Sequence, residues 1–331
     1  MATHVLVTGA TGALGPRVVE ALAAAGWAVR VFALDRPCPG DLPPDTDVRV
    51  GDITDPSAVA AATEGVDAVV HMASLLHVIN PSPALRSEYE RVNVGGTGRV
   101  VEAARRAGVG RLVFFSTIAV YGSSTGVLTE ESSPAPDSLY AETKLAAEQT
   151  VLIARRPDGH PLGTVLRLAA VYGGRVKGNY RRLLLALARK RFIRIGAGLN
   201  RRTLVYDRDV ARAALLALEH PLAAGRVLNV SDGKYHSINA IVAEISAALG
   251  QMPPRWSLPV SPVRAVAGMI ENAARLAGRH VTIGRAAIDK YCEEVTVSSL
   301  RIQQELGFVP RYDLAAGWRE TVQDLRRQGV L

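Results

Sequence analysis

Cysteine is scarce in this chain. Only Cys38 and Cys292 occur among 331 residues, and neither lies in a spacing typical of a metal site. We therefore expect neither a disulfide framework nor a bound metal. No apolar run reaches the length of a membrane span, and the sequence enters an apolar strand pattern without a charged leader segment. These absences predict a soluble, cytoplasmic protein with no membrane partner.

Aromatic residues make up 5% of the chain, and acidic residues are missing from one long stretch. Residues 174–202 hold ten basic side chains and no acidic one, in a chain whose net charge is +8. Aromatic residues are sparse in this stretch and it has no nucleic-acid motif, so a nucleic-acid partner is not expected. Most of these cations are interpreted as a solvated face. The remaining hypothesis is an anionic, phosphorylated small molecule.

A strand followed by a glycine-rich turn stands near the start of the sequence. Residues 5–7 are apolar, Gly9, Gly12 and Gly15 are three apart, and a helical pattern runs from about 14 to 25. Such a turn aims backbone N–H groups and the positive end of a helix at one place, where a diphosphate can bind. Glycine permits the turn and the close approach of the phosphate. Taken alone, the motif is also compatible with an ordinary turn.

Strand and helix patterns alternate through the first half of the chain. Strands are expected at 28–34, 48–50, 68–73, 111–116 and 164–168, with helices at 57–63, 92–108 and 140–155 between them. This alternation predicts an α/β fold, a doubly wound parallel sheet of the Rossmann type. His71, at the end of a buried strand, is expected to pack or hydrogen-bond rather than to catalyse.

The second half is less regular and predicts a smaller mixed α/β substrate-binding region. Short strands are expected at 204–206 and 227–230, and helices at 180–191, 210–219, 238–249, 263–277, 300–306 and 314–326. The helix at 263–277 carries Arg264, Glu271 and Arg275, so a packed globular helix is favoured over a membrane-surface helix. We assign residues 1–173, with about 203–230, to a cofactor domain, and about 174–202 and 231–331 to substrate binding.

Two neighbouring residues bear on the choice of dinucleotide. An acidic residue about twenty positions beyond a glycine turn accepts hydrogen bonds from the adenosine ribose, whereas an arginine there favours a 2′-phosphate. Asp35 and Arg36 place an acidic residue and an arginine next to each other at the end of the same strand. NAD is favoured, with NADP as the alternative.

Tyr140 and Lys144 are spaced i, i+4 in a predicted helix, so their side chains share one face. A lysine ammonium beside a phenol favours the phenolate, and the pair therefore predicts a lowered tyrosine pKa. Tyr140 would then be an acid/base near neutral pH. A surface pair with no function is the alternative for this spacing alone.

Together these residues resemble the extended short-chain dehydrogenase/reductase family, in its NAD-dependent nucleotide-sugar epimerase/dehydratase branch. The resemblance covers nearly the whole chain. It rests on seven segments in the expected order: 8–15, 51–52, 71–74, 92–97, 115–122, 140–144 and 166–173. It implies an oxidoreductase or isomerase that is similar to UDP-glucose 4-epimerase, and a homodimer.

The resemblance also implies roles for single residues. Thr117, Tyr140 and Lys144 would be catalytic, with Lys144 also holding the nicotinamide ribose. Asn93 would be the family's structural asparagine near the active site. The implied cofactor contacts are Gly9, Thr11, Gly12, Ala13, Leu14, Gly15, Asp35, Arg36, Asp52, Ile53, Met72, Ala73, Ser74, Asn93, Ser116, Tyr140 and Lys144. The implied substrate contacts are His77, Thr117, Tyr140, Asn179 and Arg202, with Arg202 on the diphosphate of a UDP-hexose.

The reaction implied is hydride transfer at C4 of the hexose, with several outcomes open. The branch's 4,6-dehydratases place Asp-Glu after the active-site threonine, where this chain has Ile118 and Ala119. A 4-epimerase or a 4-ketoreductase remains. The alternatives are a 3β-hydroxysteroid dehydrogenase-like alcohol oxidoreductase, which would not need Arg202, and a non-catalytic cofactor-binding protein.

Overall fold

The structure is a computed structural model that describes residues 3–76, 85–123, 126–276 and 284–331. Its centre is a seven-stranded sheet in the order β12-β7-β5-β4-β1-β2-β3, in which every neighbouring pair is parallel. The strands are β1 (His4–Thr8), β2 (Ala28–Ala33), β3 (Asp47–Val50), β4 (Ala68–His71), β5 (Arg111–Thr117), β7 (Gly163–Leu168) and β12 (Val227–Val230). The predicted doubly wound Rossmann-type sheet is confirmed.

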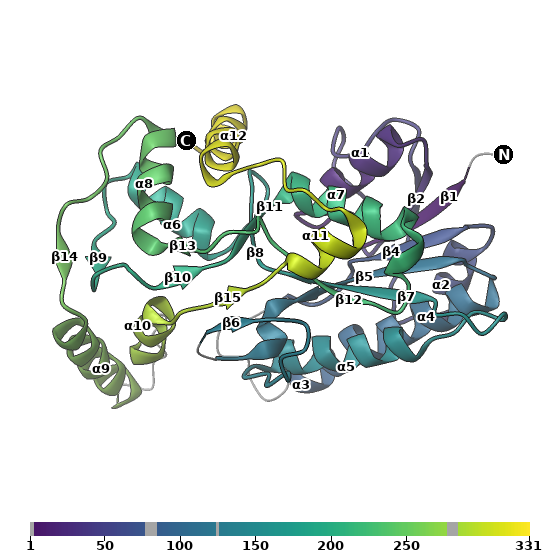
Figure 1. The fold of residues 1–331 in the computed structure, drawn as a ribbon, viewed down its shortest axis with the longest axis horizontal. Coiled ribbons are helices and arrows are strands. Elements are labelled where there is room, and N and C mark those ends of the chain that lie inside the picture. Colours follow the sequence, from purple (N-terminus) through teal and green to yellow (C-terminus); the bar gives the residue numbers. More distant parts are fainter. Residues whose placement is uncertain (1–2, 77–84, 124–125, 277–283) are drawn as a thin grey trace.

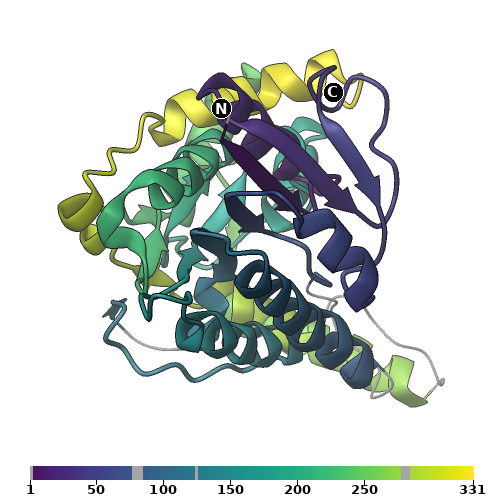
Figure 2. The same cartoon turned by 90° about the vertical axis from the view of Figure 1, so that its right-hand side faces the viewer.

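Helices cover both faces of this sheet because alternate side chains of each buried strand point to opposite faces. Leu6 of β1 belongs to one apolar core, whereas Val5 and Val7 belong to the other. One face is covered by α1 (Gly15–Ala24) and α7 (Asp207–Glu219), and the other by α2 (Pro56–Thr63), α4 (Thr97–Arg106) and α5 (Leu139–Ile153). Figure 2 shows α4 and α5 on one side of the sheet and α7 on the other.

The C-terminal lobe has its own apolar core. It lies in the left half of Figure 1 and is built from α6 (Asn179–Ala188), α8 (Ile238–Leu249) and α12 (Leu314–Arg327). Trp318 of α12 stacks on Tyr172, with 4.3 Å between the ring centroids. The outer helices α9 (Val260–Leu276) and α10 (Arg285–Cys292) pack on each other at the lower left. α11 (Leu300–Leu306) lies at the Rossmann sheet instead, where Ile302 joins its core.

Short strand pairs connect the remaining segments. β8 (Ala170–Tyr172) pairs with β11 (Leu204–Tyr206), and β6 (Val127–Leu128) with β15 (Thr296–Val297). β10 (Arg201–Arg202) pairs with β13 (His236–Ser237), and β9 (Arg194–Ile195) with β14 (Ser257–Leu258). None of the helices that the structure describes is long and apolar enough to cross a membrane.

Most predicted elements are present, with bounds that shift by up to three residues, as in α7, α9 and β4, and two differences affect the local conformation. The helix expected at 92–108 begins as a short α3 (Leu85–Tyr89) and a π-helical segment, η1 (Glu90–Gly96), before α4. The helix expected at 180–191 ends at Ala188, and Lys190 adopts a positive φ of 55°. A 3-10 segment, η2 (Ile118–Tyr121), follows β5, and another, η3 (Pro221–Ala223), follows α7. The division into two domains stays a prediction.

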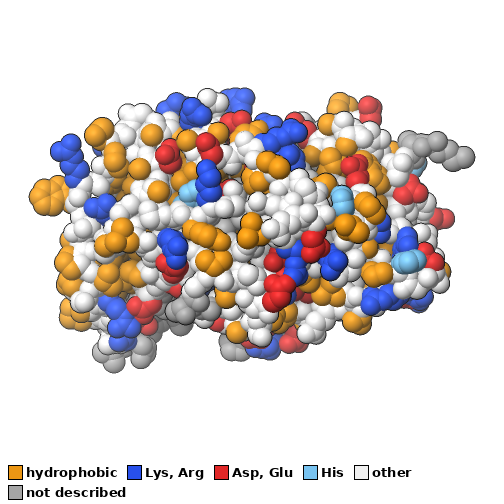
Figure 3. Space-filling model, in the orientation of Figure 1, with side chains coloured by type: hydrophobic (Ala, Val, Ile, Leu, Met, Phe, Trp, Pro, Cys, Tyr) orange, Lys and Arg blue, Asp and Glu red, His pale blue; other side chains and the backbone are white. Residues whose placement is uncertain are grey.

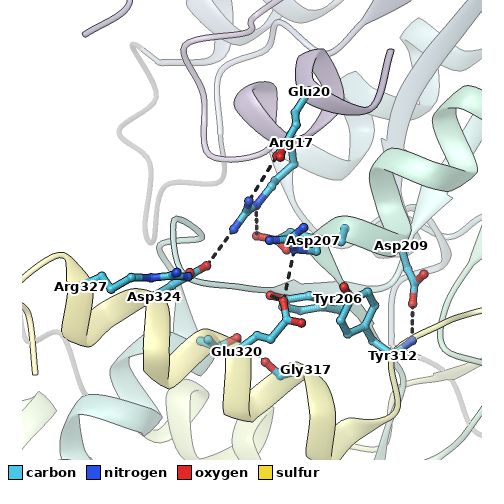
Figure 4. A network of polar contacts seen from close by, with 12 residues as sticks. Arg17, Glu20, Tyr206, Asp207, Asp209, Tyr312, Gly317, Glu320, Asp324 and Arg327 are labelled. Atoms are coloured by element: carbon cyan, nitrogen blue, oxygen red, sulfur yellow. Dashed lines mark hydrogen bonds and ion pairs between the residues drawn. The ribbon is translucent and has the colours of Figure 1, made fainter. Parts of the chain in front are cut away.

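A polar network joins the start of the Rossmann fold to α12. Figure 4 shows Arg17 of α1 between the carboxylates of Asp207 in α7 and Asp324 in α12. Its guanidinium lies 2.8 Å from Asp324 and 3.9 Å from Asp207. Burial raises the pKa of Asp207 to about 6, and Gly173 packs so closely on that carboxylate that a Cβ there would collide with it. The network therefore fixes α1 against the C-terminal lobe.

Candidate active site

The predicted site residues come together at the carboxyl ends of the sheet strands. Because all strands are parallel, these ends meet at the same edge, which is where ligands bind in open α/β sheets. Gly9 follows β1, Asp35 follows β2, Asp52 follows β3, Ala73 follows β4, and Thr117 ends β5. The edge thus contains both the glycine turn and the candidate catalytic threonine.

The glycine turn is tightly packed at two of its glycines. Gly9 has a φ of +74°, and a Cβ at this position would lie 2.7 Å from the backbone of Ala73. A Cβ on Gly15 would collide with the carbonyl of Ala10. Glycine is therefore required both to turn the chain after β1 and to bring α1 close to it. The glycine turn therefore packs directly on the segment that follows β4.

The start of α1 fits an anion. Among the described residues, no side chain caps this helix and no acidic residue stands in its first turn, whose second residue is Pro16. Thr11 and Gly12 are exposed, and Ala13 and Leu14 are half-buried. Free amides at a helix N-terminus carry partial positive charge, so this turn suits the diphosphate of a dinucleotide.

His71 is a structural residue, as expected. Its Nδ1 lies 2.6 Å from the Thr8 hydroxyl and its Nε2 lies 2.9 Å from the Thr97 hydroxyl. Thr97 donates to the carbonyl of Asn93 at 2.6 Å, so the imidazole donates from Nε2 and accepts at Nδ1. Burial lowers the pKa of His71 to about 3, which keeps the ring neutral. It holds β4 to β1 and to the start of α4.

Asn93 connects three elements of the site. Its carbonyl oxygen accepts from the Leu75 amide at 2.7 Å, and its amide donates to the Thr143 hydroxyl at 3.1 Å and to the Leu75 carbonyl at 3.3 Å. It is buried in the π-helical segment η1, a kind of irregularity found often at functional sites. Its side chain thus fixes the loop after β4 against α5.

Tyr140 and Lys144 lie one turn apart on α5, which packs on β5. Lys144 is buried and its Nζ lies 4.0 Å from the ring centroid of Phe114. Burial lowers the pKa of Lys144 to about 7, and Glu148 opposes that effect. Burial also raises the pKa of Tyr140 to about 12. The predicted lowering of the tyrosine pKa is therefore wrong for the protein without its ligands, because burial raises this pKa and the neighbouring Tyr89 raises it further.

Thr117 and Ser116 point to different surroundings. The Thr117 hydroxyl is half-buried at the end of β5 and accepts from the Ala119 amide at 3.1 Å. The Ser116 hydroxyl instead donates to the buried carboxylate of Glu148. The Ser116 hydroxyl is thus occupied within the protein, and Thr117 stays the predicted substrate contact. A cofactor contact from Ser116 would come from its backbone.

A buried ion pair that was not predicted from the sequence joins α5 to β7 beneath the candidate catalytic residues. Arg167 of β7 donates to Glu148 of α5 at 2.7 and 3.1 Å, and both side chains are buried. The Arg167 guanidinium also lies over the Tyr121 ring, 4.8 Å from its centroid. Glu148 stands four residues after Lys144, so continuing the i, i+4 spacing from Tyr140 is the signal that would have found it.

The adenosine side of the predicted site is open. Asp35 and Arg36 are both exposed after β2, so the structure offers either to a ribose or its phosphate. Asp52 accepts from the Thr54 amide at 2.8 Å, which lowers its pKa, and Arg91 lies 3.7 Å from it. Ile53 is buried against Gly96 of η1, where a Cβ would lie 2.6 Å from it. Met72 and Ser74 are half-buried beside Ala73.

The predicted substrate residues lie in the C-terminal lobe. Asn179 is exposed at the first position of α6. Arg202 donates to the carbonyls of Lys290 at 2.5 Å and Tyr291 at 3.2 Å, in the last turn of α10. These carbonyls are acceptors at the negative end of a helix and they hold the guanidinium in one place. His77 lies outside the described residues.

Comparisons with known proteins agree with this geometry. Residues 5–231 match the NAD dependent epimerase/dehydratase family. The chain is 29% identical over 326 residues to N-acetyl-alpha-D-glucosaminyl-diphospho-ditrans,octacis-undecaprenol 4-epimerase of Escherichia coli O157:H7, covering 98% of this chain and 95% of that protein. It is 30% identical to 3 beta-hydroxysteroid dehydrogenase/Delta 5-->4-isomerase of Mycobacterium tuberculosis, covering 79% and 73%.

A solved structure is similar over the same length. MoeE5 in complex with UDP-glucuronic acid and NAD superposes with a TM-score of 0.76 at 29% identity, covering 98% of this chain and 99% of that one. The matched family is one of NAD-dependent enzymes, and its region includes the glycine turn, Thr117, Tyr140 and Lys144. The chain belongs to the NAD-dependent epimerase/dehydratase family, within the extended short-chain dehydrogenases/reductases.

Proposed function

We propose that this protein is a 4-epimerase type of oxidoreductase that acts on a diphosphate-linked hexose by hydride transfer at C4. The observation that carries the proposal is the placement of Thr117 at the end of β5, with Tyr140 and Lys144 on the helix packed against that strand. The glycine turn at the same sheet edge would hold the diphosphate of NAD. A homodimer and a cytoplasmic location belong to the same proposal.

Tyr140 would move the proton of the C4 hydroxyl. In the oxidising direction its phenolate accepts this proton while the C4 hydrogen leaves as hydride, and in the reducing direction the phenol returns it. Bound NAD supplies the hydride acceptor and, after oxidation of the sugar, the donor. An epimerase returns the hydride to the opposite face of the C4 carbonyl, so the cofactor is regenerated in each turnover.

Two side chains would prepare Tyr140 for this step. With its pKa near 12 the phenol holds its proton at neutral pH, so the liganded site has to favour the phenolate. Lys144 in its charged form does so through space, one helical turn away. The Thr117 hydroxyl would form a hydrogen bond with the C4 oxygen of the sugar. This bond would orient the C4 hydroxyl toward Tyr140.

The neighbouring residues argue against loss of water from the sugar. A 4,6-dehydratase needs a second acid/base pair directly after the threonine. Here Ile118 is buried in η2 and is followed by Ala119, and neither carries a titratable group. This absence of a second acid/base supports a reaction at C4 alone.

The diphosphate is the substrate feature that the C-terminal lobe favours. Arg202 has a guanidinium held at the end of α10, and planar guanidinium groups bind diphosphate oxygens in pairs. Residues 174–202 add further cations and no acid. The similar E. coli epimerase acts on a sugar diphosphate joined to undecaprenol, and MoeE5 binds UDP-glucuronic acid, so both named ligands share this group. A steroid has no diphosphate for Arg202 to bind.

The test is a panel of substrates on the purified protein. UDP-glucose and UDP-galactose should interconvert, and so should their N-acetylated forms. Chromatography of the sugar nucleotides measures this interconversion. The absorbance at 340 nm should show no net NADH, whereas a dehydrogenase would form about one NADH per turnover. Net NADH formation would instead identify a dehydrogenase. Turnover of 3β-hydroxysteroids with no effect on any sugar diphosphate would contradict the proposal.

We expect NAD to bind more tightly than NADP. Asp35 is exposed after β2 and can accept from the ribose hydroxyls, whereas it repels a 2′-phosphate. Calorimetric titration should give a preference of about tenfold or more for NAD, the size of one charge-assisted hydrogen bond. Asp35→Asn should reduce this preference, and Arg36→Gln is the matched control that should leave NAD binding unchanged. Tighter binding of NADP would assign the selectivity to Arg36.

A further inference from the structure

The outer face of α9 is apolar and exposed. Its inner side packs on α10, with Ala267 buried between the two helices. The opposite side carries an unbroken set of exposed apolar residues at helical spacing, and Met269 among them is 63% exposed. This set comprises Pro262, Ala265, Val266, Met269, Ile270 and Ala273. Soluble monomers seldom expose a continuous apolar helix face, so this one requires an explanation.

Arg264 and Glu271 of α9 do not interrupt that face. Arg264 donates to Asp289 of α10 at 2.7 and 3.0 Å, and Glu271 lies 3.5 Å from Arg285 of α10. Both charges are therefore directed toward the neighbouring helix. These two charges, together with Arg275, favoured a packed globular helix over a membrane-surface helix in the sequence. The structure packs α9 on α10 on the side of Arg264 and Glu271, and leaves the opposite side apolar.

The apolar surface continues beyond α9 along β14. Trp256 precedes this strand and is 87% exposed, and Leu258 is exposed within it. Since Ser257 pairs with Arg194 in parallel register, Trp256 stands beside the exposed Ile193. Figure 3 shows orange side chains gathered at the left end of the molecule, over β14 and α9. We call this set, together with the outer face of α9, the apolar end.

Cations accompany the apolar end. Arg189, Lys190, Arg191 and Arg255 are exposed, and none forms an ion pair with a carboxylate in the described part of the chain. Residues 174–202 and 245–270 contain no acidic residue at all. The apolar end thus combines exposed tryptophan and methionine with unpaired arginine and lysine. This composition is typical of a segment that lies in the interface of an anionic bilayer.

We propose that the apolar end docks on the surface of an anionic lipid bilayer. The apolar residues enter the boundary between headgroups and acyl chains, and the four cations contact lipid phosphates. Charge favours this partner over a second copy of the chain, because a two-fold interface would bring the same unpaired cations together. The chain would lie on the membrane without spanning it.

The position of Arg202 extends this inference to the substrate, in a step that rests on the proposed function. Arg202 is held by the last turn of α10, and α10 is the helix on which α9 packs. A diphosphate bound by Arg202 therefore lies next to the docked pair of helices. The group beyond the diphosphate would be an isoprenoid chain anchored in that bilayer, so the sugar is presented by a membrane lipid.

Vesicle flotation tests the docking independently of activity. Full-length protein is mixed with vesicles of phosphatidylglycerol and phosphatidylcholine in equal parts, and with vesicles of phosphatidylcholine alone. It should float with the anionic vesicles and much less with the neutral ones. Trp256→Ser with Met269→Ser should lower the vesicle partition coefficient by about tenfold or more, and Arg189→Glu with Lys190→Glu should do the same at low salt. Ile153→Ser with Leu222→Ser, two exposed apolar residues of the Rossmann domain, is the matched control and should float normally.

The outcomes separate the two steps. If no vesicle binds the protein, or if the double-serine variant only converts a dimer to a monomer in sedimentation, the surface joins proteins and the docking proposal is wrong. If the protein floats and interconverts UDP-hexoses but leaves a polyprenyl diphosphate-linked hexose in the vesicles unchanged, docking stands and the lipid substrate is refuted. Reaction of neither sugar would refute the proposed function, while flotation still decides the docking.

Discussion

Tyr140→Phe is expected to reduce turnover by a factor of about 10³ or more, with cofactor binding nearly unchanged. The substitution removes one phenolic oxygen from α5 and retains the ring, so the packing on β5 persists. Without that oxygen no group moves the proton of the C4 hydroxyl, and the alkoxide that precedes hydride transfer cannot form. Turnover is measured on the sugar that the wild type interconverts, and NAD binding is measured by calorimetry on the same preparation.

A second tyrosine provides the control for this experiment. Tyr121 is buried near the end of β5, and its hydroxyl donates to Asn229 at 2.9 Å. Tyr121→Phe also deletes one buried phenolic oxygen, and it should lower stability by about 1 kcal/mol while retaining most of the turnover. Wild-type turnover in Tyr140→Phe would remove the acid/base assignment. Equal losses in both variants would show that the effect is structural.

Glu148→Ala is expected to lower the free energy of unfolding by about 3 to 5 kcal/mol. The reason is that Arg167 remains buried without its carboxylate, and the Ser116 hydroxyl loses its acceptor. Replacing both members of the pair, as in Glu148→Leu with Arg167→Met, should recover much of that loss because no charge is left unpaired. Urea unfolding of the three proteins provides the free energies.

An exposed ion pair supplies the comparison. Glu102 of α4 pairs with Arg105 and Arg106 at 3.0 and 2.7 Å, on the solvent side of the helix. Exposed pairs of this kind contribute little, so Glu102→Ala should leave the free energy of unfolding nearly unchanged. An equally small effect in Glu148→Ala would mean that water reaches Arg167 and that the pair does not support the site.

The parts that could be predicted from the sequence are those set by local pattern. The glycine turn, the alternation of strand and helix, and the bounds of helices such as 238–249 follow from residues near one another in the chain. The strand pairs β6 with β15 and β10 with β13 could not be predicted, because two-residue strands carry no periodicity. The π-helical start of the segment at 90–96 breaks the 3.6-residue period that the prediction assumed.

The electrostatics of the site also depend on distant residues. The i, i+4 spacing places Tyr140 and Lys144 one turn apart on α5, but the direction of the tyrosine pKa follows from burial that the whole fold imposes. Arg202 was identified from its motif, yet its partners are the carbonyls of α10, about ninety residues later. Likewise the charges of α9 favoured a packed helix, but the sequence did not show that Arg264 and Glu271 both pair with α10 and leave the opposite side apolar.

The contact between Arg17 and Asp324 can form only late in the synthesis of the chain. Arg17 stands in the first turn after the cofactor's glycine turn, and its partner Asp324 is 307 residues further along. At ribosomal rates of about 5 to 20 residues per second, roughly 15 to 60 s separate the two. During that interval the nascent Rossmann strands emerge and pair without the contact that fixes α1. We therefore expect the glycine turn to bind dinucleotide at full strength only after Asp324 has emerged and paired with Arg17.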